Sequence, residues 1–195
     1  MPFTRSELER FAAKERDRFE KTLKDLVEAA SVSADPDHKS DVERCAELGA
    51  AAIRVFGGRA ELHRAPGGNP IVLGSFESGK GQPTVTVYNH LDVQPASKET
   101  EPWRTEPFAF TRESDTYFGR GTTDDKGPAL TALFGARAAL EAGVPVNIKF
   151  LWETEEEIGS PHFAETLRGI GPAAATDAVV VSDTVWVSRG DRKSV

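Results

Sequence analysis

The sequence contains a single cysteine, Cys45, among its 195 residues. One thiol excludes an intrachain disulfide framework and any zinc site built from several thiolates. A bound metal would therefore be held mainly by His, Asp and Glu side chains. Cys45 lies inside an expected helix, where we expect a buried, small apolar residue, because nothing near it in the sequence predicts the lowered thiol pKa of a nucleophile.

Long apolar runs and a basic surplus are also lacking. No segment approaches the ~20 apolar residues of a membrane span, and the first residues, Met1-Pro2-Phe3-Thr4, lack the apolar core of a signal peptide. We therefore expect a cytoplasmic protein with no membrane partner. The 24 basic residues are outnumbered by 31 acidic ones, giving a formal net charge of -7. This charge argues against a nucleic-acid partner.

Apolar periodicity and turn residues predict helices that alternate with strands. Two pairs, Thr4 with Glu7 and Ser40 with Glu43, have capping-box spacing and predict the start of the first two helices. Alternating elements imply a βαβ arrangement around a largely parallel or mixed sheet. The expected helices are 5–30, 40–57, 127–143 and 162–168, and the expected strands are 59–64, 71–76, 84–89, 115–118, 144–152 and 178–183.

Residues that can bind metal stand where several of these strands end. His90-Leu91-Asp92, Glu156-Glu157 and Asp183 each follow a strand, and Asp124 lies in a Gly-rich turn before a helix. In open α/β sheets the functional groups gather at this carboxyl edge. One imidazole with several carboxylates suits Zn²⁺ and is acceptable to Mn²⁺ or Co²⁺. On a strand, residues two apart share a face, so the Asp92 carboxylate can accept the second ring N–H of His90 and fix its tautomer.

Each of these signals also has a simpler interpretation when it is taken alone. A carboxylate at the position of Asp124 is typical of a helix N-cap. An acidic run such as Glu153 to Glu157 is usually a solvated face. The coincidence of the signals at one sheet edge, rather than any one of them, indicates a metal site.

Four stretches also carry a family resemblance. They are Asn89-His90-Leu91-Asp92-Val93-Gln94-Pro95-Ala96, the segment from Tyr117 to Pro128 around Thr122-Thr123-Asp124-Asp125-Lys126-Gly127, then Glu155-Glu156-Glu157-Ile158-Gly159-Ser160, and finally Ser182-Asp183. In order, spacing and flanking residues they resemble the carnosinase and carboxypeptidase G group of dinuclear zinc exopeptidases, nearest to the carnosinase-like dipeptidases. The resemblance implies a phosphorylase/hydrolase-like zinc exopeptidase catalytic domain, an α/β fold with a mixed, largely parallel sheet flanked by helices.

The same resemblance implies a ligand set for two Zn²⁺ ions, with Mn²⁺ or Co²⁺ as alternatives. By this similarity His90 and Asp183 bind one metal, Asp124 bridges both metals, and Glu157 binds the other. Two cations about 3.5–4 Å apart need such a shared carboxylate and make a nucleophilic hydroxide available near neutral pH.

Two further roles are implied in the same way. Asp92 would orient His90, and Glu156 would be the general base that takes a proton from the metal-bridging water and returns it to the leaving amine. The resemblance also implies a cis peptide bond between Asp124 and Asp125.

In the family, the second metal also uses a histidine from near the C-terminus of a longer chain, beyond an inserted lid domain that usually dimerises. We therefore expect residues 1–195 to be the N-terminal portion of the catalytic domain, without the lid/dimerisation domain and the C-terminal catalytic portion, and the longer parent to be a homodimer. His162, close behind Glu157, is a substitute ligand to consider.

The leading hypothesis is metal-dependent hydrolysis of a peptide bond in a dipeptide or at a peptide C-terminus. Deacylation of an N-acyl amino acid uses the same amide chemistry and is the alternative within enzymes. A third reading is an inactive, truncated domain that binds metal or a protein partner, and a fourth is an acidic surface with only a structural role.

Overall fold

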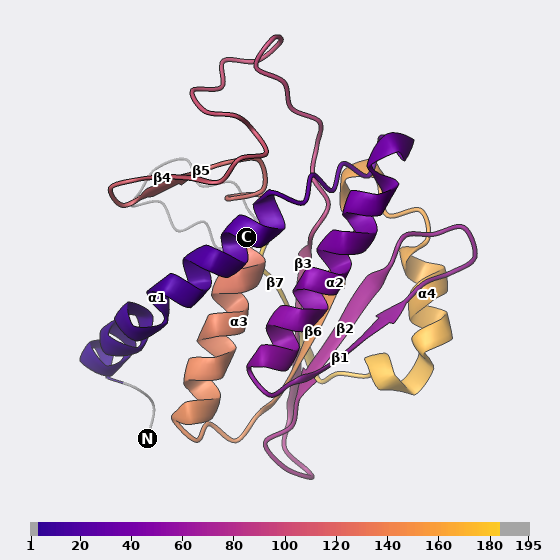
Figure 1. Ribbon diagram of the computed structural model, residues 1–195. Helices are drawn as coiled ribbons and strands as arrows, with labels where there is room; N and C mark the ends of the chain where they lie inside the picture. The colour runs from indigo at the N-terminus through magenta and orange to yellow at the C-terminus, as the bar shows by residue number, and fades with distance from the viewer. Residues whose placement is uncertain (1–3, 184–195) are drawn as a thin grey trace.

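The computed structural model describes residues 4–183, and its centre is a five-stranded mixed sheet (Figure 1). The strand order is β1-β2-β6-β3-β7. The pairs β1–β2 and β2–β6 are antiparallel, whereas β6–β3 and β3–β7 are parallel. The expected mixed sheet is thus confirmed, with its parallel half on the side of the predicted site. The strands are β1 Arg59–His63, β2 Ile71–Phe76, β3 Thr84–His90, β6 Asn147–Glu153 and β7 Ala178–Val181.

Helices cover both faces of the sheet. In Figure 1, α1 (Arg5–Val27), α2 (Lys39–Val55) and α3 (Lys126–Glu141) lie side by side on one face. Trp152 of β6 is buried on that face, where a Cβ added to Gly49 of α2 would lie 3.2 Å from its ring. The opposite face carries α4 (Phe163–Ile170), whose Phe163 ring packs edge-on against Tyr88 of β3 at 5.8 Å.

The predicted first capping box is confirmed and the second is wrong. The Thr4 side chain accepts from the Glu7 N–H while the Glu7 carboxylate accepts from the Thr4 N–H, so α1 begins as expected. The second helix begins at Lys39 and has no side-chain cap. A 3₁₀ turn, Pro36–His38, runs directly into it, and Asp35 caps that turn by accepting from the Asp37 N–H. The cap therefore lies one turn earlier than the Ser40 position.

The start of β6 and the burial of β7 differ most clearly from the prediction. The strand expected from residue 144 begins at Asn147, because Gly143, at φ +72°, and Val144 are engaged in the turn that ends α3. The apolar run of β7, expected to be buried, lies at an edge of the described sheet, and Val179, Val180 and Val181 are exposed.

The carboxyl ends of the parallel strands β3, β6 and β7 meet at one edge of the sheet, as parallel pairing requires. Beyond that edge, Figure 1 shows the long loop after β3 and a small hairpin of β4 (Thr111–Glu113) and β5 (Thr116–Phe118). The hairpin leads into the Gly-rich turn before α3. None of the helices between residues 4 and 183 has the length and apolar character needed to cross a bilayer.

Candidate metal centre

The Gly-rich turn before α3 is tightly folded, and glycine is required at its end. A Cβ on Gly127 would lie 2.0 Å from the Thr122 carbonyl oxygen, which is backbone and cannot give way. The Gly127 N–H donates to the Gly121 carbonyl at 3.2 Å, closing the turn. Between them, the Asp124–Asp125 peptide bond is cis, as the resemblance implies.

The buried side chain of Lys126 links this turn to the end of α1. The Lys126 ammonium is fully buried and donates to the carbonyl oxygens of Leu26 at 2.8 Å and Ala29 at 2.9 Å. Burial lowers the pKa of Lys126. The ammonium adds a charged donor to two carbonyl oxygens that also accept from backbone N–H groups, that of Ala29 for Leu26 and that of Ser31 for Ala29. A positive charge here also complements the C-terminal end of the α1 dipole.

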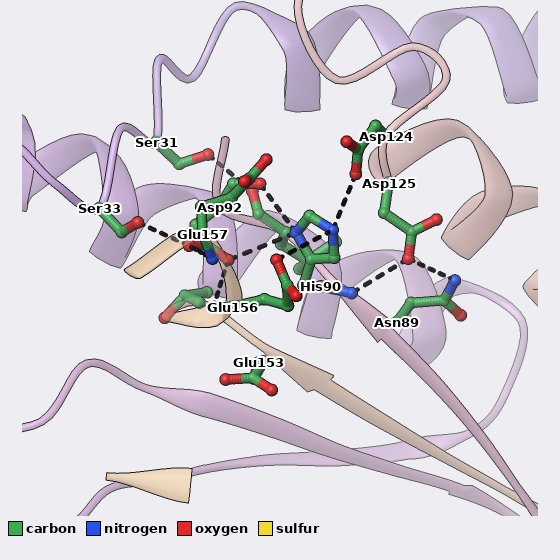
Figure 2. A network of polar contacts seen from close by, with 12 residues as sticks. Ser31, Ser33, Asn89, His90, Asp92, Asp124, Asp125, Glu153, Glu156 and Glu157 are labelled. Carbon is green, nitrogen blue, oxygen red and sulfur yellow. Dashed lines mark hydrogen bonds and ion pairs between the residues drawn. The ribbon is translucent and has the colours of Figure 1, made fainter. Parts of the chain in front are cut away.

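His90 lies at the centre of the site, with its Nε2 atom facing three carboxylates (Figure 2). Nε2 is 2.9 Å from Asp124 Oδ1, 3.8 Å from Asp183 Oδ2 and 4.0 Å from Glu156 Oε2. The ring is only 1% exposed. Burial alone would lower the pKa of His90, but the hydrogen bonds with Asp124 and Asp92 and the surrounding negative charge outweigh it and raise the pKa to about 11.

Asp92 contacts His90 differently from the prediction. Because β3 ends at His90, the two residues do not share a strand face. The Asp92 main-chain oxygen lies 3.1 Å from His90 Nδ1, and the nearer carboxylate oxygen lies 3.5 Å away. The carboxylate also accepts from the Ser33 hydroxyl at 2.6 Å and from the N–H groups of Glu156 at 3.2 Å and Glu157 at 3.1 Å. Asp92 thus holds both His90 and the turn that carries the two glutamates.

Glu156 and Glu157 begin a 3₁₀ turn, Glu156–Ile158, directly after β6. Burial raises the pKa of Glu156, and the nearby charges of Asp183, Asp92 and Asp124 raise it further. Burial also raises the pKa of Glu157, although a hydrogen bond from Gln94 opposes this. Gln94 Nε2 donates to Glu157 Oε2 at 2.8 Å, a contact that the sequence analysis did not anticipate.

The candidate metal-binding residues form two groups that share His90. One group is His90, Asp124 and Asp183, and the other is His90, Glu156 and Glu157; within each, the ligand atoms lie within 4.8 Å of one another. The second group contains Glu156, which was predicted as the general base, and among the described residues neither group unites Glu157 with the predicted bridging residue Asp124. The ion pairs of Asp124, Glu156 and Asp183 all go to the same imidazole. Among residues 4–183, carboxylate charge therefore exceeds the positive charge of the imidazole that it surrounds. An oxygen-rich donor set with one imidazole fits a divalent cation such as Zn²⁺, Mn²⁺ or Co²⁺.

The rest of the acidic run has a different environment. Glu153 and Glu155 are buried, so the interpretation of the run as a solvated face is wrong. Glu155 accepts from the Asn69 N–H at 2.9 Å, and its other oxygen lies 3.0 Å from His162 Nδ1. The structure therefore pairs His162, the substitute ligand considered above, with Glu155, and neither metal-binding group among the described residues includes it.

Two further residues beside the site were missed as functional residues by the sequence analysis. Asp125 Oδ2 accepts from Asn89 Nδ2 at 2.7 Å and from the His90 N–H at 3.2 Å (Figure 2). Burial raises the pKa of Asp125 to about 7, although these hydrogen bonds lower it. The sequence could have indicated both residues by their position, because Asn89 directly precedes the candidate ligand His90 and Asp125 directly follows Asp124.

The sequence profile of Peptidase family M20/M25/M40 matches residues 86–192. The chain belongs to this family. Its relatives include the Cys-Gly metallodipeptidase dug1 of Schizosaccharomyces pombe, 36% identical over 93% of the chain and 40% of that protein. The Beta-Ala-His dipeptidase of Rattus norvegicus is 34% identical over 89% of the chain and 38% of that protein.

A solved structure of an M20 relative supports the same assignment. The dipeptidase Dug1p of Saccharomyces cerevisiae superposes with a TM-score of 0.81 at 29% identity, over 91% of this chain and 40% of that one. The chain thus spans about 40% of the length of these relatives.

Proposed function

We propose that the protein containing these residues is a metal-dependent peptidase that hydrolyses the peptide bond of a dipeptide, or the last bond of a short peptide. The observation that carries the proposal is the position of His90 Nε2 among Asp124, Asp183 and Glu156 at the carboxyl edge of the sheet. The names of the relatives, a Cys-Gly metallodipeptidase and a Beta-Ala-His dipeptidase, support a dipeptide as the substrate class.

The proposed ligands are residues of four separate segments. His90 and Asp183 would hold one cation, Asp124 would be shared between two cations, and Glu157 would hold the second. Two Zn²⁺ ions are the proposed cofactor, with Mn²⁺ or Co²⁺ compatible with the same donors. Ligation requires a neutral imidazole, so His90 must release a proton when the metal binds.

When bound, such cations polarise the substrate carbonyl and lower the pKa of a water molecule towards neutrality. Glu156 is the proposed proton carrier of the reaction. Its carboxylate would accept a proton from the attacking water and give it to the leaving amine. Burial raises the pKa of Glu156 above that of an ordinary glutamate, which supports a role in taking up a proton. The Asp92 carboxylate accepts from the Glu156 N–H and thereby positions this side chain.

Turnover of dipeptides in the presence of Zn²⁺, Mn²⁺ or Co²⁺ tests the proposal, with N-acetyl amino acids as the competing substrate class. Glu156→Gln should abolish turnover while metal binding remains. Glu165→Gln on α4 is the matched control, because Glu165 is an exposed carboxylate outside the site. Preferential hydrolysis of N-acetyl amino acids would favour a deacylase, and full activity of Glu156→Gln would contradict the proposed role of that residue.

A further inference from the structure

Asn89 lies directly before His90 on β3, with its side chain on the opposite face of the sheet. The residue is fully buried. Its amide nitrogen Nδ2 donates two hydrogen bonds, one to Asp125 Oδ2 at 2.7 Å and one to the Ser182 carbonyl oxygen at 2.9 Å. Figure 2 shows the first of these to the right of the His90 ring.

Each of the two partners adjoins a different candidate ligand. Asp125 follows Asp124 in the turn before α3, and Ser182 precedes Asp183 after β7. The Asp125 oxygen that binds Asn89 also accepts from the His90 N–H at 3.2 Å. One side-chain amide therefore joins three chain segments, each of which supplies one ligand of the group formed by His90, Asp124 and Asp183.

The chemistry of these contacts requires a primary amide. Both partners are oxygen acceptors, so the NH₂ group of Asn89 must face them, and each of its hydrogens serves one partner. An aspartate at this position would offer no donor when ionised, and a serine would offer only one.

We propose that Asn89 is a positioning residue that holds Asp124 and Asp183 at the distances from His90 at which one cation can be bound by all three. This inference rests on the metal site of the proposed function. Asn89 touches no reacting group. It acts through Asp125 and Ser182, whose backbones carry the neighbouring ligands.

The first test is metal affinity, measured by competition between the 195-residue chain and a chromogenic chelator for Zn²⁺ and for Co²⁺. Asn89→Ala removes both hydrogen bonds and should weaken the affinity about 10- to 100-fold, the usual effect of losing an outer-shell partner. Asn89→Ser retains one donor and should lose less. The d–d spectrum of bound Co²⁺ should change in Asn89→Ala, because the ligand geometry changes.

Asn147 offers a matched control at the other end of the sheet. Its amide nitrogen also donates two hydrogen bonds, to the carbonyl oxygens of Gly79 at 3.3 Å and Gln82 at 3.2 Å. Asn147→Ala should lower stability but leave metal affinity and the Co²⁺ spectrum unchanged. An equal loss of affinity in both variants would reduce the role of Asn89 to general stability and overturn the proposal.

The second test needs no metal and therefore separates this inference from the metal site itself. Amide hydrogen exchange of the metal-free chain should accelerate about tenfold or more in Asn89→Ala at His90, whose N–H donates to Asp125, and at Ser182, whose N–H donates to the Tyr88 carbonyl. The same amides should be unaffected in Asn147→Ala.

The two experiments distinguish a failure of this inference from a failure of the proposed function. A wild-type chain that binds no metal defeats the proposed function, while the exchange experiment still decides whether Asn89 joins the three segments. Unchanged exchange at His90 and Ser182, or wild-type metal affinity in Asn89→Ala, overturns the proposal. If Asn89→Ala does not fold, the same two measurements are made on Asn89→Ser. If neither variant folds, with or without Zn²⁺, Asn89 has a role in folding alone and the proposal is overturned.

Discussion

His90 Nε2 lies 2.9 Å from Asp124 Oδ1, although 34 residues separate them in the sequence. His90 ends a parallel strand, whereas Asp124 lies in a turn held by a buried lysine and by close glycine contacts. Neither element alone positions the pair. The contact depends on the packing of α1, α3 and the sheet, so the stability of the fold and the geometry of the candidate metal site are linked at this point.

Metal affinity should increase with pH, because the cation competes with the proton on His90. The pKa of His90 in the metal-free chain is raised to about 11, so the imidazole is charged at neutral pH and must lose its proton on binding. Affinity should therefore rise up to about tenfold for each pH unit below that pKa. Isothermal titration in buffers of different ionisation enthalpy measures the proton release. A pH-independent affinity with no released proton would contradict this assignment of His90.

Gly127→Ala should disrupt the turn that carries Asp124. The added Cβ would meet the Thr122 carbonyl oxygen at 2.0 Å, so the backbone must move, and we expect a loss of more than about 2 kcal/mol together with weaker metal binding. Gly135→Ala is the control in the same helix, where an added Cβ meets nothing within 4 Å. That change should stabilise the protein by about 0.5–1 kcal/mol. Chemical denaturation measures both, and equal effects would refute the close contact.

Lys126→Met should destabilise the chain by about 2–3 kcal/mol, because two buried carbonyl oxygens of the α1 end lose a charged donor. Lys21→Met on α1 is the control, since the Lys21 ammonium is exposed and forms a surface ion pair with Asp25 one turn along that helix. The control should change stability by less than about 0.5 kcal/mol. Urea denaturation compares the two variants, and a Lys126→Met chain as stable as the control would show that this ammonium is dispensable.

The Glu43–Arg64 pair should contribute a small, pH-dependent stability. The two terminal guanidinium nitrogens of Arg64 donate to the Glu43 carboxylate, at 2.6 and 2.7 Å, and these hydrogen bonds lower the pKa of Glu43. A carboxyl pKa that is lower in the folded state stabilises the protein above the unfolded value, about 4.5, and the stability is lost as the pH falls through the folded value.

Because this pair is partly exposed, its contribution should be below about 1 kcal/mol and should shrink with added salt. Comparing the denaturation midpoints of wild type and Glu43→Gln between pH 3 and pH 7 measures it. The difference should be largest at pH 7 and should shrink as the pH falls towards 3. A difference that is independent of pH would assign the effect to packing.

The elements that the sequence predicts well are those with strong local signals. The apolar and β-branched pattern of β3 and the capping box of α1 specify these elements from local chemistry, and both are confirmed. The capping residue before α2 was predicted wrongly, because a 3₁₀ turn capped by Asp35 precedes the helix and Ser40 lies inside it. The exposure of β7 depends on its position in the sheet, which no local pattern encodes.

The proximity of His90, Asp124 and Asp183 was also predictable, because the motifs place them after strands or, for Asp124, in the turn before a helix at the same sheet edge. Their supporting residues were not. Ser33 reaches Asp92 from 59 positions away, and Gln94 reaches Glu157 from 63 positions away. Such contacts follow from the packing of loops on the finished sheet. The sequence also could not show that the Asp92 carboxylate, expected beside His90, accepts from the backbone N–H groups of Glu156 and Glu157 as well.

Metal stoichiometry tests the central claim most directly. The purified 195-residue chain and its Asp124→Asn variant are equilibrated with Zn²⁺, freed of excess metal, and analysed for zinc per chain. The account predicts that the wild type retains at least one tightly bound ion through His90, Asp124 and Asp183, and that Asp124→Asn loses it. A wild type that retains no zinc, or a variant that retains as much as the wild type, would contradict the account.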